Sequence, residues 1–161
     1  PLKFILGRYR LEAESYFGAE WNLSHDQLVI EPDPDTTQIR ITNIIPGASP
    51  PMIRPIMGSV DVAEEEITVK SAQQWSDPKS NGYYISFYKG SPETGEEGNG
   101  IIWPAPIDEP FILTWSGSGS EITISGLDNW GPKSMEPSGV FEWFWWWDFY
   151  TSTTLTKVED Y

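Results

Sequence analysis

The sequence predicts an all-β protein, and three observations support this. No long stretch places apolar residues with the spacing of a helix face. Fourteen glycines and fourteen prolines are spread along the chain. The segments between them alternate with period two or are rich in β-branched and aromatic residues, which is typical of short strands joined by turns. With 161 residues, the chain fits one domain, spanning 1–161. We expect an antiparallel meander that closes as a β-barrel of about 8–10 strands, with a two-sheet β-sandwich as the alternative.

The strictest alternation lies in residues 7–17, where Tyr9, Leu11 and Ala13 share one face and charged residues occupy the other. This pattern predicts a strand with one face on a core and one in water. Four prolines in residues 46–55 predict a loop, because proline cannot sit in a central strand. Residues 91–99 read as an acidic loop and residues 117–120 as a turn. Further strands are expected at 26–31, 37–45, 57–61, 66–70, 83–88, 100–103, 110–115, 121–125, 140–150 and 151–157.

Charge and composition exclude several functions. The net charge is −14, from 24 acidic and 10 basic residues, which argues against nucleic acid and anionic membranes as partners. The absence of cysteine excludes disulfides and thiol chemistry. No stretch approaches the roughly 18 apolar residues of a membrane-spanning helix. Because the sequence starts at Pro1 without a methionine, we expect a processed chain, with any signal peptide or lipid anchor upstream.

The segment 140–150 is the most unusual part of the sequence, since it reads V-F-E-W-F-W-W-W-D-F-Y. In an extended strand its odd-numbered residues, Trp147 and Phe149 among them, form an all-aromatic face that is predicted to be core. The even face is mixed and is a candidate glycan-binding patch, because a flat ring stacks on a sugar while a carboxylate accepts hydroxyl hydrogen bonds. The alternative is that this face lines a second layer. The candidate residues on the even face are Trp146, Glu142, Asp148 and Phe144.

A second candidate platform combines Trp75, Trp103 and Trp130, each of which lies near turn residues. Loops carry function more often than strands do. The alternative for each ring is packing over the end of the barrel.

The sequence gives little support to catalysis. His25 is the only histidine, its neighbours predict a surface turn, and no G-x-S-x-G motif is present. A pair of carboxylates could hydrolyse a glycoside, and Glu142 among tryptophans is the best candidate for one member. Acidic loops could supply calcium ligands, but none has the EF-hand pattern. We therefore assign no catalytic residue, no metal site and no cofactor.

Three short motifs resemble the calycin or lipocalin barrel, in particular the calycin-like domains of Bacteroides-type exported lipoproteins of uncharacterised function. They are an early Gly7-Arg8-Tyr9, the pair Gly58-Ser59-Val60-Asp61 and Ile67-Thr68-Val69, and a closing Leu155-Thr156-Lys157. The resemblance implies a β-barrel and an extracellular or cell-envelope location, including that of an outer-membrane lipoprotein. It implies no site residue.

These observations favour an exported, non-enzymatic binding or accessory domain. Its expected partner is a glycan or a small apolar ligand in the barrel mouth. Two alternatives stay open: a carbohydrate-active enzyme using paired carboxylates, and a structural component of a surface assembly.

Overall fold

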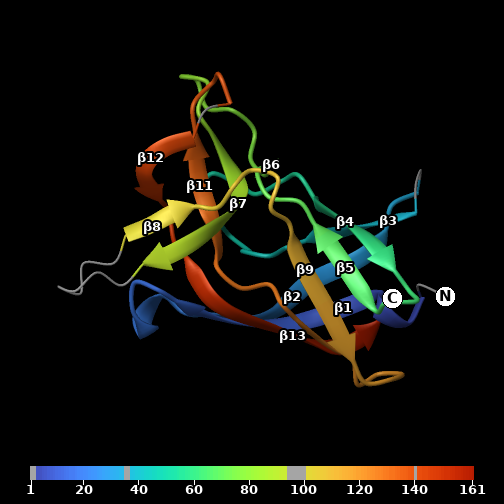
Figure 1. Ribbon diagram of the computed structural model, residues 1–161. Coiled ribbons are helices and arrows are strands. Elements are labelled where there is room, and N and C mark those ends of the chain that lie inside the picture. Colours follow the sequence, from blue (N-terminus) through green and yellow to red (C-terminus); the bar gives the residue numbers. More distant parts are fainter. Residues whose placement is uncertain (1–2, 35–36, 94–100, 140) are drawn as a thin grey trace.

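The computed structural model describes residues 3–34, 37–93, 101–139 and 141–161, without the side chains of residues 93, 101 and 141–145. It confirms the all-β prediction: eight antiparallel strands form a closed barrel, and further strands extend from it (Figure 1). The barrel strands are β1 (Gly7–Ser15), β2 (Leu23–Pro32), β3 (Gln38–Thr42), β4 (Ile56–Asp61), β5 (Glu66–Val69), β9 (Phe111–Ser116), β10 (Thr123–Ser125) and β13 (Tyr150–Asp160).

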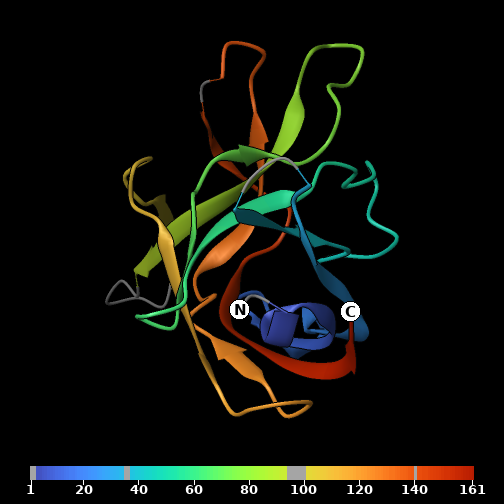
Figure 2. The same ribbon diagram turned by 90° about the vertical axis from the view of Figure 1, so that its right-hand side faces the viewer.

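The barrel closes through the pairing of its first and last strands. β13 runs antiparallel to β1 from the pair Gly7↔Asp160 to the pair Ser15↔Tyr150, and it also pairs with β10. Closure of this kind removes the unpaired strand edges through which sheets aggregate. The chain ends therefore lie on the same side of the molecule (Figure 2).

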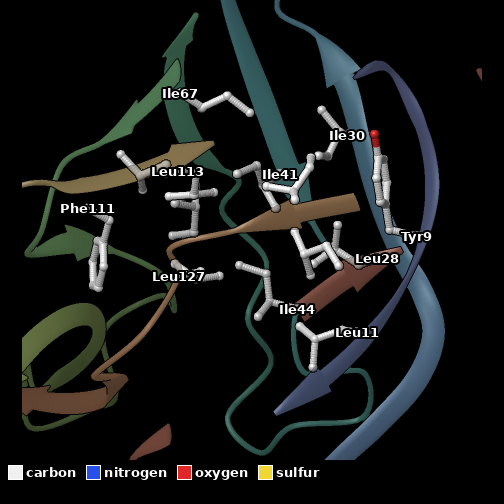
Figure 3. Packing of buried hydrophobic residues seen from close by; sticks show 14 of the residues in the cluster. Tyr9, Leu11, Leu28, Ile30, Ile41, Ile44, Ile67, Phe111, Leu113 and Leu127 are labelled. Carbon is white, nitrogen blue, oxygen red and sulfur yellow. The ribbon is translucent and has the colours of Figure 1, made fainter. Parts of the chain in front are cut away.

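The barrel interior is filled with side chains. Tyr9, Leu11 and Ala13 are buried, as the alternation in β1 predicts. Aliphatic side chains from facing strands converge on them, with Leu28 and Ile41 among those drawn in Figure 3. Barrels of eight strands are just wide enough for side chains to fill.

The strand order departs from a simple meander, because two excursions leave the barrel. One lies between β5 and β9 and contains three strands; the other lies between β10 and β13 and contains two. The two excursions pair with each other, since β7 and β11 are antiparallel neighbours from Trp130↔Lys89 to Met135↔Tyr84. The extra strands are β6 (Gln73–Gln74), β7 (Tyr84–Glu93), β8 (Ile101–Pro104), β11 (Trp130–Met135) and β12 (Phe141–Trp146).

Several local expectations can be compared with the structure. The loop at 46–55, the strands at 57–61 and 66–70 and the turn at 117–120 are confirmed, and the two strands pair as a hairpin. The acidic-loop prediction for 91–99 is wrong at its start, because β7 continues to Glu93. The remaining residues of that predicted loop, 94–99, lie outside the described part of the structure. No described helix is long and apolar enough to cross a membrane.

The predicted single strand over 140–150 is broken. β12 ends at Trp146, β13 begins at Tyr150, and the chain bends between them. The two-face prediction for this segment therefore fails. Phe149 is buried as expected, but Trp147, predicted to be core, is 43% exposed. The odd-numbered residues Phe141, Trp143 and Trp145 have side chains outside the described part of the structure.

Candidate functional site

The candidate site is a surface groove of about 250 Å³ between two chain connections. One connection joins β1 to β2 and the other joins β12 to β13; they lie side by side because Ser15 pairs with Tyr150 where the two strands meet (Figure 1). The groove, called here the aromatic groove, is lined by Phe17, Trp21, Trp146, Trp147 and Asp148.

The β1–β2 connection presents two rings to solvent. Gly18 has a φ of 135°, a backbone conformation that residues with a side chain rarely adopt, so this turn favours glycine. The 3-10 helix η2 (Ala19–Trp21) follows, with the Trp21 N–H donating to the Gly18 carbonyl at 3.1 Å. Phe17 is 49% exposed and Trp21 is 59% exposed. The turn therefore holds two large rings in water.

Tyr16 anchors the same connection to the rest of the protein. Its N–H donates to the Phe149 carbonyl at 2.8 Å. Its ring packs edge-on against Phe17, with centroids 5.5 Å apart, and against Phe149 at 6.3 Å. Edge-to-face pairs of this kind add to the stability gained from burial. Phe17 therefore packs against Tyr16 on one side and lines the aromatic groove with its exposed surface.

The two tryptophans of the β12–β13 connection have different environments. Trp146 is half-buried and packs edge-on against Phe149 at 5.0 Å, with the Lys133 ammonium 5.5 Å from its ring. The backbone N–H of Trp147 donates to the Pro132 carbonyl at 3.0 Å, and the Lys79 ammonium lies 5.0 Å from the Trp147 ring. Trp146 therefore forms the inner wall of the aromatic groove, and Trp147 forms an exposed rim.

Asp148 organises the floor of the groove. Its Oδ1 accepts hydrogen bonds from the Ser15 hydroxyl and from the Phe149 N–H, both at 2.7 Å. Its Oδ2 accepts one from the Tyr150 hydroxyl at 3.2 Å. Burial, and then the charge and hydrogen bond of Asp148, raise the pKa of Tyr150. A carboxylate offers about four acceptor positions, so this one is engaged mainly in joining β1 to β13.

Gly131, on β11, lets the β12–β13 connection approach that strand closely. A methyl group at Gly131 would lie 2.3 Å from the Asp148 carbonyl oxygen and 3.0 Å from the Trp146 ring. We expect Gly131→Ala to displace both residues and to lower the free energy of unfolding by about 1–3 kcal/mol, the usual cost of overpacking. Chemical denaturation measures the change. Gly119→Ala is the matched control, because open space surrounds that position and only its positive φ of 64° opposes the substitution. Equal losses in the two variants would contradict the packing argument.

The structure brings together two of the residues predicted on the even face, Trp146 and Asp148. The side chains of Glu142 and Phe144 lie outside the described part of the structure. The sequence did not predict Phe17 or Trp21 as site residues, and it predicted Trp147 as a core residue. The segment Y-F-G-A-E-W was a usable signal, because it places large rings on both sides of a glycine turn between two strands.

The second candidate platform is not a surface feature. Trp75 and Trp130 do meet, with ring centroids 6.2 Å apart, but they are 2% and 0% exposed and belong to the core. Their ring faces contact other core rings, so a ligand in solvent does not reach them. Trp103 lies on β8, partly buried, and does not line the aromatic groove.

His25 has a structural role. It lies within β2 rather than in the predicted turn. Its Nδ1 accepts from the Gln27 N–H at 3.1 Å, so Nε2 carries the proton and donates to the Ile44 carbonyl at 2.7 Å. Neither nitrogen is left to act as a base. Among the described residues, no group of three or more histidine or acidic side chains is arranged to hold a metal ion.

These features define a closed eight-strand antiparallel barrel that carries extra strands and an aromatic groove on its surface. Comparisons of the chain with protein-family models, with curated proteins and with solved structures found no match. The groove itself is therefore the feature that bears on function.

Proposed function

We propose that the protein is a non-enzymatic glycan-binding module. One observation carries the proposal: Phe17, Trp21 and Trp147 expose between 43% and 59% of their surfaces around one groove. Large apolar rings gathered on a surface mark interaction sites. Flat rings suit sugars because they stack on the C–H faces of a pyranose. The indole N–H groups of the exposed Trp21 and Trp147, and the acceptor position that Asp148 retains, supply polar partners for hydroxyl groups.

The proposed setting is the cell envelope or the extracellular space, as a calycin-like exported lipoprotein. The closed antiparallel barrel is consistent with a calycin outline. The net charge of −14 fits a domain that stays soluble without binding anionic polymers.

Catalysis by paired carboxylates receives less support from the described residues. Asp148 is the one carboxylate that lines the groove in this part of the chain, and three donors already hold it. A group fixed in this way positions the rings, whereas a general acid or base must exchange its proton with a substrate.

A small apolar ligand is the second candidate occupant, and a different hollow favours it. This hollow, of about 460 Å³, lies beside the 3-10 helix η1 (Lys3–Ile5) at the barrel mouth and is lined by Lys3, Leu6, Pro32 and Tyr161. The barrel interior is filled by core side chains, so an apolar ligand would have to lie in this hollow rather than inside the barrel.

The test is binding of the purified protein to a broad glycan array, with Trp21→Ala and Tyr161→Ala alongside. We expect wild type to bind a defined glycan class and Trp21→Ala to weaken that binding at least about tenfold, the usual scale for truncating a central tryptophan. Tyr161 is also an exposed ring but lies at the barrel mouth, so its variant is the matched control. Absence of binding to any glycan, or equal loss in both variants, would contradict the proposal.

A further inference from the structure

A second hollow lies near the aromatic groove, on the outer wall of the barrel. It measures about 350 Å³ and lies over the part of β1 that pairs with β2 and β13. This polar groove is lined by Glu12, Ala13, Glu14, Asn22, Leu23, Ser24, Ser152 and Thr154.

Ser15 forms a hydrogen bond with one lining residue of each hollow. Its N–H donates to the Asn22 Oδ1 at 2.8 Å, and Asn22 lines the polar groove. Its hydroxyl donates to the Asp148 Oδ1 at 2.7 Å, and Asp148 lines the aromatic groove. Trp21 and Asn22, adjacent in the chain, line one hollow each. The lining residues of the two grooves are therefore neighbours, so a ligand longer than one sugar could contact both.

The polar groove has the chemistry of a hydroxyl-binding surface. Glu12 and Glu14 point outward from β1, with Ser24 opposite Glu12 on β2 and Ser152 opposite Glu14 on β13. Within the described part of the chain, neither glutamate has an ion-pair or side-chain hydrogen-bond partner. Their carboxylates are thus available to accept hydrogen bonds from a ligand, and the serines can donate or accept.

From this adjacency we infer that the site takes an oligosaccharide rather than a single sugar, and one without carboxylate or sulfate groups. One end of the chain stacks in the aromatic groove, and the following residues hydrogen-bond along Glu12 and Glu14. Unpaired carboxylates repel an anionic glycan at this position, so the charge of the groove selects neutral chains. The inference rests on the proposed function, because it assigns the ligand class of the same site.

The test compares affinities for a length series of neutral oligosaccharides from the class found on the array, and for uronic-acid oligosaccharides of equal length. We expect affinity to rise with length and the acidic chains to bind at least about tenfold more weakly. Glu12→Gln/Glu14→Gln should lower the affinity for the longest neutral chain about three- to tenfold, leave the shortest unchanged, and reduce the discrimination against acidic chains. Glu121→Gln, an exposed glutamate that lines neither groove, is the matched control.

The outcomes separate the two proposals. If chains of all lengths bind equally, if acidic chains bind as well as neutral ones, or if the double variant behaves as wild type, the extended site is wrong while glycan binding stands. If no chain binds, or if chains bind and Trp21→Ala leaves that binding unchanged, the proposed function itself is wrong.

Discussion

Trp130→Ala is expected to lower the free energy of unfolding by about 3–5 kcal/mol, the range for removing a large buried ring. Trp130 is completely buried at the point where β11 meets β13. Its ring stacks on Phe87, with centroids 5.1 Å apart, and lies 4.6 Å from the ring of Tyr150. Its indole N–H donates to the Thr153 hydroxyl at 2.8 Å. The substitution therefore removes ring contacts that join barrel strand β13 to the extra strands β7 and β11, and it leaves a cavity.

Chemical denaturation followed by circular dichroism measures this effect. The matched control is Trp21→Ala, which removes the same side chain from an exposed position and should change the free energy of unfolding by less than about 1 kcal/mol. Losses of equal size in the two variants would contradict the assignment of Trp130 to the core.

Alkaline pH is expected to destabilise the protein steeply above about pH 10. Burial, then the charge of Asp160, raise the pKa of Tyr9 above its usual value near 10. Burial, then the charge and hydrogen bond of Asp148, raise that of Tyr150. The folded state therefore keeps these phenols protonated at a pH where the unfolded chain releases the protons. Stability is fully present below about pH 10 and falls above it, by about 1.4 kcal/mol per pH unit for each tyrosine.

Denaturation midpoints measured between pH 8 and pH 11 test this expectation, with tyrosinate absorbance as the second signal. Tyr161 is exposed, so Tyr161→Phe should leave the alkaline slope unchanged, whereas Tyr9→Phe should make it shallower. A slope that is the same in wild type and Tyr9→Phe would show that Tyr9 is not the group that titrates.

The barrel was predictable because its signals are local. The alternation of Tyr9, Leu11 and Ala13 fixes which face of β1 is buried, and the glycine-rich turn at 117–120 fixes the hairpin of β9 and β10. The pairing of the two excursions was not predictable, since β7 and β11 are far apart in sequence. β11 also lacks a strand signal: W-G-P-K-S-M contains a glycine and a proline, and Pro132 sits in a paired strand opposite Phe87.

The candidate site was predictable only in part. Period-two reasoning assumes an extended chain, and the bend after Trp146 reverses the expected exposure of Trp147. Asp148 lies in the same groove as Trp146, but its hydrogen bonds to Ser15 and Tyr150 depend on the closure of β1 against β13. A long-range contact of this kind leaves no trace in local spacing. The rings of Phe17 and Trp21 join the site for the same reason.

The most direct test of the aromatic groove as a glycan site is a nuclear magnetic resonance titration of the indole N–H signals of the nine tryptophans. A bound glycan should shift the signals of Trp21 and Trp147 and leave those of the buried Trp75 and Trp130 unchanged. Glycan binding that leaves the Trp21 and Trp147 signals in place would contradict the account, as would the absence of any shift with every glycan tested.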